Sequence, residues 1–175
     1  GCTVVCRQRR CVRCEQYGGR MVFEQGMTGC GVARGGAESV YAKSIPGFKP
    51  DMTARGKVIG GGMPMAAFGG TREVMQNLAR LGGVCQAGTL SGNPVATACG
   101  LATLREIQKP DFYDALAART QSLVSGLSQA ATQAGVPFCA DSEGGMFGFF
   151  LLDQLPQNYP QVMKTDGPSF NRFYH

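Results

Sequence analysis

The strongest amphipathic pattern in the chain covers residues 111–134. Apolar side chains recur there at helical spacing: Phe112, Leu116, Leu123, Val124, Leu127 and Ala131. Gly135 follows directly, and glycine commonly closes a helix because it adopts the left-handed conformation without strain. The pattern therefore predicts a long helix that buries one face.

A second helix is predicted to begin at Asn93 and Pro94. Asparagine is a good helix cap, and proline fits the first helical position because its missing N–H has no partner there in any case. The apolar residues that follow at roughly helical spacing are Val95, Cys99, Leu101 and Leu104.

Short apolar runs between turn residues predict strands in both halves of the chain. These runs lie at residues 52–55, 65–69, 136–140 and 146–152. A helix near the start, stopped by Gly18 and Gly19, is predicted to lead into a further strand at residues 21–23. The alternation of helices and strands favours an α/β fold.

The remaining segments complete the predicted organisation. Thr71 is predicted to cap a helix that runs to about Leu81, a further helix is expected near residues 168–174, and residues 38–51 are interpreted as a loop. The pattern changes after Lys109 and Pro110. We therefore place a domain boundary there, between a segment of residues 1–109 and a segment of residues 110–175.

Composition narrows the class of protein. Of the 175 residues, 43% are hydrophobic and 17% are charged, as in globular proteins. No apolar run has the length of a membrane span, and no charged segment followed by an apolar one resembles a signal peptide. We expect a soluble, intracellular protein that does not bind a membrane.

The formal charge of +5 raises the question of nucleic-acid binding. Several of the arginines gather in the first twenty residues, and the other basic residues are dispersed. Since no groove-reading motif accompanies them, a solvated surface is the better interpretation, and we expect no nucleic-acid partner.

Four of the eight cysteines fall close together near the start of the chain: Cys2, Cys6, Cys11 and Cys14. Only Cys11 and Cys14 have the two-residue gap of a zinc knuckle, and the sole histidine is His175. We therefore expect no metal site, and a secreted disulfide framework is less favoured still.

Lys57 is the candidate for covalent chemistry. It lies between a short predicted strand and the three glycines at 60–62. A lysine amine becomes a nucleophile towards carbonyls when its surroundings lower its pKa, and glycines let the backbone approach a flat ligand. A solvated lysine followed by a glycine turn explains the same pattern, so the residues alone leave both interpretations open. A phosphate-binding loop is excluded because Val58, not serine or threonine, follows the lysine.

Three blocks add a resemblance to this picture. The runs GKVIGGGMPMAAFGG, QAGTLSGNPVA and GGMFGFF occur in this order. Together they resemble the glutamate-1-semialdehyde 2,1-aminomutases, within the class III aminotransferase-like pyridoxal-phosphate enzymes. The resemblance implies a fold-type I α/β enzyme, with residues 1–109 as part of its large mixed-sheet domain and 110–175 as part of its small C-terminal α+β domain. It also implies pyridoxal 5'-phosphate as cofactor and a homodimer.

The resemblance assigns roles to four residues. Lys57 would hold the cofactor as a Schiff base and carry protons during catalysis. Glu24 stands where the family has an aspartate that pairs with the pyridinium nitrogen. Thr89 matches a threonine that in the family reaches the cofactor phosphate of the other subunit, and Gly88 before it offers a backbone N–H to the same anion. Without the family, Glu24 is a strand-end acid and the Gly-Thr pair an ordinary loop before a helix cap. Gly26 departs from the family, which has a valine there.

The implied reaction is an intramolecular amino transfer that converts glutamate-1-semialdehyde, a small amino-aldehyde, to 5-aminolevulinate in tetrapyrrole biosynthesis. Two alternatives remain: a class III aminotransferase with separate amino donor and acceptor, and a non-catalytic remnant. The location would be the cytoplasm, or the plastid stroma in a plant. We expect the chain to be a fragment of a longer enzyme, inactive alone, with Lys57 after a strand end and facing a cleft that contains Glu24.

Overall fold

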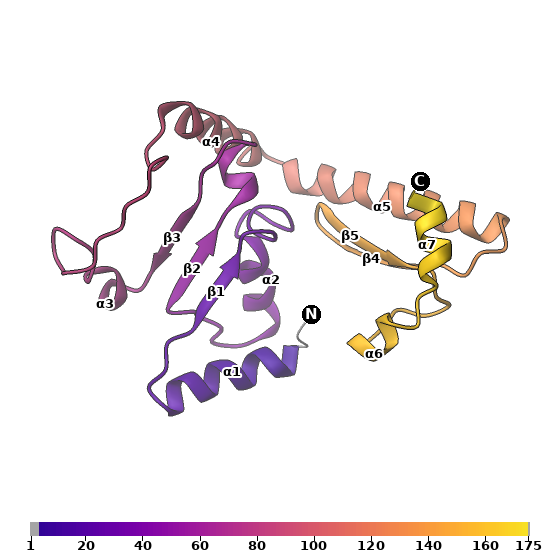
Figure 1. Ribbon diagram of the computed structural model, residues 1–175, viewed down its shortest axis with the longest axis horizontal. Coiled ribbons are helices and arrows are strands. Elements are labelled where there is room, and N and C mark those ends of the chain that lie inside the picture. The colour runs from indigo at the N-terminus through magenta and orange to yellow at the C-terminus, as the bar shows by residue number, and fades with distance from the viewer. Residues whose placement is uncertain (1–3, 175) are drawn as a thin grey trace. The chain divides into compact units, whose positions relative to one another are not determined.

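The computed structural model describes the backbone of residues 4–174 and the side chains of residues 10–174, which form two compact units that we describe separately. The first ends at Phe112 and the second begins at Tyr113. The elements of the first unit are α1 (Val4–Gln16), β1 (Val22–Gln25), α2 (Gly36–Ser44), β2 (Met52–Arg55), the 3-10 helix η1 (Lys57–Gly60), β3 (Ala67–Gly70), α3 (Arg72–Met75) and α4 (Pro94–Ile107) (Figure 1). The assignment of the two units to domains of a larger enzyme stays a prediction.

A three-stranded sheet organises the first unit, with β2 between β1 and β3 (Figure 1). Strands β1 and β2 are parallel and pair Glu24 with Ala54, whereas β3 runs antiparallel to β2. Because parallel strands end at the same edge of a sheet, the residues that follow β1 and β2 meet there. Lys57 follows β2 at this edge, as the sequence predicted.

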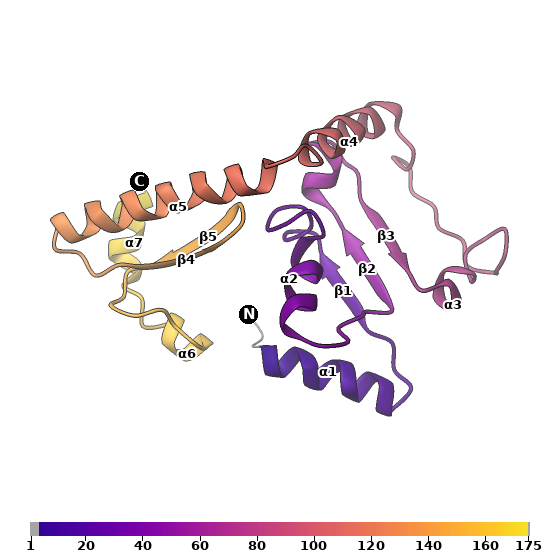
Figure 2. The same cartoon turned by 180° about the vertical axis from the view of Figure 1, so that it is seen from behind.

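The core of the first unit lies where α2 covers β1 (Figure 2). The rings of Phe23, Tyr41 and Phe48 meet edge to face, with centroids 5.3 to 6.0 Å apart. Ile45, only 2% exposed, ends the helix beside them. Edge-to-face contacts and burial together fix α2 against the sheet.

A buried polar network crosses the same interface. The Gln25 side chain is 1% exposed, accepts a hydrogen bond from the Glu38 N–H and donates one to Glu38 Oε2. The Thr53 hydroxyl donates to the same Oε2 at 2.9 Å. Glu38 thus joins α2 to both parallel strands, and each polar group finds a partner as burial requires.

Helix α4 begins as predicted, because the Asn93 side chain accepts hydrogen bonds from the N–H groups of Val95 and Ala96. The buried face of α4 does not coincide with the apolar residues that predicted the helix. Val95 and Leu101 are about half exposed, whereas small residues, Ala96 and Gly100, face inward. Small side chains are selected because the helix approaches η1 closely.

The second unit pairs a long helix with a hairpin. Its elements are α5 (Phe112–Gln133), β4 (Cys139–Glu143), β5 (Met146–Phe150), α6 (Tyr159–Val162) and α7 (Gly167–Tyr174). The hairpin is antiparallel and turns at Gly144, whose φ of 59° favours glycine. Phe149 of β5 packs against Phe138, Phe170 and Phe173 with ring centroids 5.3 to 5.7 Å apart, which ties α7 to the hairpin. Within the GGMFGFF block, Phe149 therefore packs inside the unit, whereas Phe147 is exposed.

The end of α5 explains why β4 starts later than predicted. Gly135 has φ +65°, and its N–H and that of Val136 donate back to Thr132 and Ala131 carbonyls. This hydrogen-bond pattern is typical of a helix that ends at a glycine, and it engages the N–H of Val136. The strand begins only at Cys139, not at residue 136.

Two helix predictions were wrong. The helix after Thr71 stops at Met75 rather than Leu81, because the Asn77 side chain donates to the carbonyls of Glu73 and Val74 and so replaces the next turn. Thr71 makes no side-chain cap bond, and its buried hydroxyl has no partner. The predicted loop of residues 38–51 is helical up to Ser44, where α2 ends.

Among the described residues, no helix is long and apolar enough to cross a membrane. No group of three or more histidine, cysteine or acidic side chains among them could hold a metal ion; Cys11 donates instead to Met21 Sδ. The side chains of Cys2 and Cys6 lie outside the described part.

Candidate active site

Lys57 lies at the carboxyl end of the parallel strands, two residues after β2 ends, and its side chain is exposed. Its backbone is left-handed, with φ 50°, a conformation that few residues other than glycine adopt. The preceding Gly56 is extended, and its backbone lies beside that of Gly26. The turn into η1 therefore sends the lysine side chain back over the ends of the two parallel strands.

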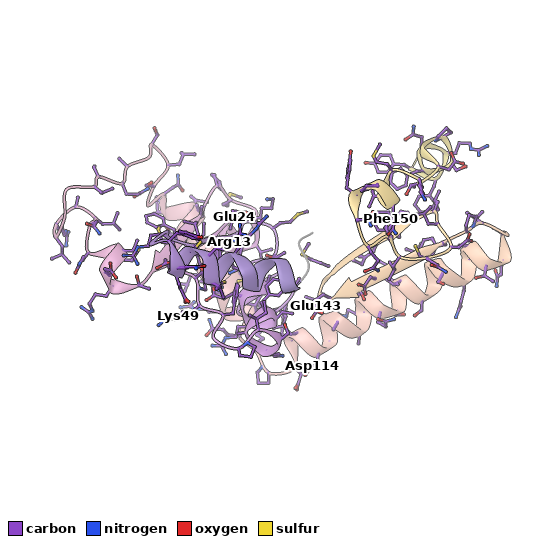
Figure 3. All side chains as sticks on the ribbon, turned by 90° about the horizontal axis from the view of Figure 1, so that it is seen from below. Arg13, Glu24, Lys49, Asp114, Glu143 and Phe150 are labelled. Carbon is purple, nitrogen blue, oxygen red and sulfur yellow. The ribbon has the colours of Figure 1, made fainter. Side chains whose placement is uncertain are left out.

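Glu24 and Lys57 lie at the same end of the parallel strands, but no ion pair joins these two described residues and neither lines a described cavity, so the predicted cleft stays a prediction. The space beside Gly26 brings them together: a Cβ placed on Gly26 would lie 3.9 Å from Lys57 Nζ and would overlap Glu24 Oε1. Both side chains are exposed, and the Gly26 N–H donates to Glu24 Oε1. Figure 3 labels Glu24 among the side chains of the first unit. An amine and a carboxylate thus share one open space, within reach of a small flat ligand.

The three glycines after Lys57 allow close packing against neighbouring residues and a turn of the backbone. A Cβ on Gly61 would lie 2.9 Å from the Cys99 carbonyl oxygen of α4 and would overlap Thr103 Oγ1. Gly60 approaches Met65, whereas Gly62 faces open space at φ 91°. The glycines therefore let η1 lie directly on α4, and this contact fixes the turn that carries Lys57.

Arg55 also shapes the end of β2, a role that no pattern in the sequence predicts. Its Nη2 donates to the Gly35 carbonyl at 2.9 Å, and its Nη1 approaches Cys30 Sγ. These bonds fasten the last residue of the strand to the start of α2. Only the folded structure, in which these partners lie beside Arg55, distinguishes this arginine from a solvated one.

Gly88 and Thr89 are not brought to Lys57 and Glu24 in the described part of the chain. Both are exposed in the loop before α4, and Gly88 lines a cavity of about 620 Å³ with Arg55, Ser91 and others. Neither Lys57 nor Glu24 lines that cavity. The predicted set of four residues therefore falls into two separate groups, a Lys57–Glu24 pair and a Gly88–Thr89 loop.

Charged side chains hold the opposite end of the strands. Asp51 accepts a hydrogen bond from the Met21 N–H at 2.8 Å and one from Arg20, which also pairs with Glu73. The Met21 N–H, followed by Arg20, lowers the pKa of the Asp51 carboxyl below its usual value. The same two acids raise the pKa of the Arg20 guanidinium further above its usual range. These bonds support the sheet but lie away from Lys57.

Comparison with known proteins decides the family. A model of the family described as aminotransferase class III matches residues 13–167. The chain belongs to this family. The class III match confirms the fold class predicted from the three sequence blocks.

Individual relatives agree with the class III assignment. The chain is 80% identical over 162 residues to a glutamate-1-semialdehyde 2,1-aminomutase of Polaromonas naphthalenivorans strain CJ2, covering 93% of the chain and 37% of that relative. It therefore spans little more than a third of the length of the curated relatives that it matches.

Solved class III structures share the fold. An omega-transaminase from Sphaerobacter thermophilus is 32% identical with a TM-score of 0.76, over 87% of this chain and 34% of that one. A glutamate-1-semialdehyde-aminomutase variant from Pseudomonas aeruginosa PAO1, in complex with PMP, is 19% identical with a TM-score of 0.72, over 93% and 37%. The second likeness bears on the fold alone.

Proposed function

We propose that this chain is the lysine-bearing part of a glutamate-1-semialdehyde 2,1-aminomutase that uses pyridoxal 5'-phosphate. The observation that carries the proposal is that Lys57 Nζ and Glu24 Oε1 both border the space beside Gly26, at the carboxyl ends of two parallel strands. Ligands of open α/β sheets bind at such an edge. The name of the highly identical relatives supplies the particular reaction.

The residues present fit this cofactor. Lys57 offers an exposed primary amine that can bond to an aldehyde, and Glu24 offers a carboxylate that can pair with a protonated ring nitrogen. Gly26 presents no side chain that would fill the space between them. When bound, pyridoxal phosphate supplies an electron sink that stabilises negative charge on a neighbouring substrate carbon.

Each side chain of the pair has a task in this proposal. Lys57 would hold the cofactor through its Nζ, and when free this amine would accept and return a proton. Glu24 would favour a protonated ring nitrogen through its negative charge. The left-handed backbone at Lys57 and the η1–α4 contact hold the amine at the strand end while these transfers occur.

Gly88 and Thr89 enter the proposal through a second copy of the chain. Their exposure, and their separation from Lys57 within one chain, agree with a role towards the cofactor phosphate of a partner subunit. A backbone N–H and a hydroxyl before a helix start are suited to an anion. The proposed protein is thus a homodimer that acts on a small amino-aldehyde in the cytoplasm.

A two-substrate class III aminotransferase is the second candidate. The omega-transaminase is more similar in sequence to this chain than the solved aminomutase is, at 32% against 19% identity. Both reactions use the same lysine, so a product assay must separate them. The longer protein that contains this chain is expected to form 5-aminolevulinate from glutamate-1-semialdehyde without an added amino donor. A strict requirement for a separate amino donor would establish the second candidate instead.

The lysine assignment has its own test. The protein is incubated with pyridoxal phosphate, reduced with borohydride and mapped by peptide mass spectrometry. The cofactor is expected on Lys57, with Lys57→Arg as a matched variant that keeps the charge and loses the label. Labelling of Lys43 or Lys49 with Lys57 unmodified would overturn the assignment.

A further inference from the structure

The Glu24 side chain is bent rather than extended. Its Oε1 accepts a hydrogen bond from the N–H of Gly26, two residues along the chain, so the side chain folds back over its own backbone. This folding takes up the extra methylene that distinguishes glutamate from aspartate. The carboxylate ends within the neighbourhood of Lys57 Nζ, beside Gly26.

Gly26 makes this conformation available. A Cβ at residue 26 would overlap Glu24 Oε1, which is the free end of an exposed side chain rather than a backbone atom. A larger residue at position 26 would therefore push the carboxylate away while the strand remained intact. Such a residue would also stand 3.9 Å from Lys57 Nζ.

We propose that Gly26 is a positioning residue for Glu24: its N–H and its missing side chain hold the long acid in a bent conformation that places the carboxylate beside Lys57. Position 26 therefore determines which acid suits position 24. Glutamate requires glycine at 26, and a shorter aspartate tolerates a side chain there. For its effect on the cofactor, the proposal rests on the proposed function.

A first experiment needs no cofactor. The amide resonances of Gly26 and Gly69 are compared by NMR at neutral pH between the unaltered 175-residue chain and the Glu24→Gln chain. The Gly26 amide is expected to move, because a bond from its N–H to a charged carboxylate is stronger than one to a neutral amide. The Gly69 amide, in β3, is the internal reference. An unchanged Gly26 amide in the Glu24→Gln chain would overturn the proposal.

A second experiment uses retention of pyridoxal phosphate after borohydride reduction, measured against cofactor concentration. Gly26→Ala is expected to raise the half-saturating concentration about tenfold, the effect of one charge-assisted contact. The matched control is Gly69→Ala, because a Cβ at Gly69 meets nothing within 4 Å. Unfolding by urea should be similar for the two variants.

Second substitutions at position 24 distinguish the effect of side-chain length from the effect of side-chain charge. In the Gly26→Ala background, Glu24→Asp should restore retention, because the shorter acid clears the new methyl group and keeps its charge. Glu24→Gln, equally long but uncharged, should restore nothing. Equal retention by Gly26→Ala and Gly69→Ala, or equal rescue by aspartate and glutamine, would overturn the proposal. If the unaltered protein retains no cofactor at all, the proposed function fails, and the comparison of amide resonances alone decides the positioning role.

Discussion

At the residue scale, the meeting of Lys57 and Glu24 follows from the order of the chain. Two short apolar runs, each followed by a polar residue and glycines, predict two strands whose ends lie together when the strands are parallel. The bend of Glu24 towards the Gly26 N–H does not follow, because a side-chain rotamer depends on neighbours in space. The fastening of Arg55 to the Gly35 carbonyl was missed for the same reason.

Glu38→Ala should destabilise the first unit by about 1–3 kcal/mol, because it leaves the buried Gln25 amide and the Thr53 hydroxyl without their acceptor. The free energy of unfolding is measured in urea. Glu106→Ala is the control, since its pair with Lys109 is exposed and worth at most about 1 kcal/mol. Equal losses for the two variants would show that the network contributes nothing.

Asp51→Asn should change how the stability of the sheet depends on pH. The folded pKa of Asp51 is lowered, first by the Met21 N–H. Its contribution is therefore present above the usual pKa of an aspartate and is lost as the pH falls through the lower, folded value. The unaltered chain should exceed Asp51→Asn in urea midpoint at neutral pH, and the gap should close in acid.

The control for Asp51 lies in the other unit. Asp166 also has a lowered pKa, caused by hydrogen bonds from Ser169. Unfolding followed by NMR distinguishes β1 resonances from those of α7. Asp166→Asn should act on α7 alone, and an equal effect of Asp166→Asn on β1 would contradict the assignment to Asp51.

At the element scale, segments with local signals were predicted well. Strand β2 occupies residues 52–55 as predicted, and α5 ends at a glycine as predicted. The errors arose where a contact beyond the local pattern decides the outcome. The Asn77 amide ends α3 by donating back to carbonyls of that helix. Helix α2 is fixed by the contact of its Tyr41 ring with Phe23 of β1, which the pattern of residues 38–51 does not reveal.

Gly61→Ala should weaken the contact between η1 and α4. The new methyl group would meet Cys99 and Thr103 in addition to the strain of a positive φ, so we expect a loss of about 2–4 kcal/mol from overpacking and strain together. Gly62→Ala also has a positive φ but meets nothing within 4 Å, and should cost only about 1–2 kcal/mol. Urea unfolding of both variants gives the comparison, and a loss for Gly62→Ala as large as that for Gly61→Ala would contradict the packing role.

At the scale of the whole molecule, the described sheet has two unpaired edges. Strands β1 and β3 pair only with β2, and both carry exposed apolar side chains, Val22 and Phe68. Exposed edges of this kind invite pairing with further strands. The chain covers 37% of its relatives' length, so the neighbours of these edges are expected in the rest of a longer protein.

The 175-residue chain alone is expected to form no appreciable 5-aminolevulinate. The Lys57–Glu24 pair is exposed to water, and a misplacement of about 1 Å in an active site can lower a rate roughly a hundredfold. The assay compares the chain with a longer protein that contains it, at equal molar concentration. Comparable product from both would show that the described residues suffice for catalysis.

The left-handed backbone of Lys57 lowers the stability of the fold at the position that carries the amine. Glycine is the residue that this φ of 50° suits best, so Lys57→Gly should unfold at a urea concentration no lower than Lys57→Ala, which keeps the strain. Selection for a sturdier fold alone would therefore tend to remove the amine. Under the proposed function the same residue supplies the reactive amine, so backbone strain and chemistry compete at position 57.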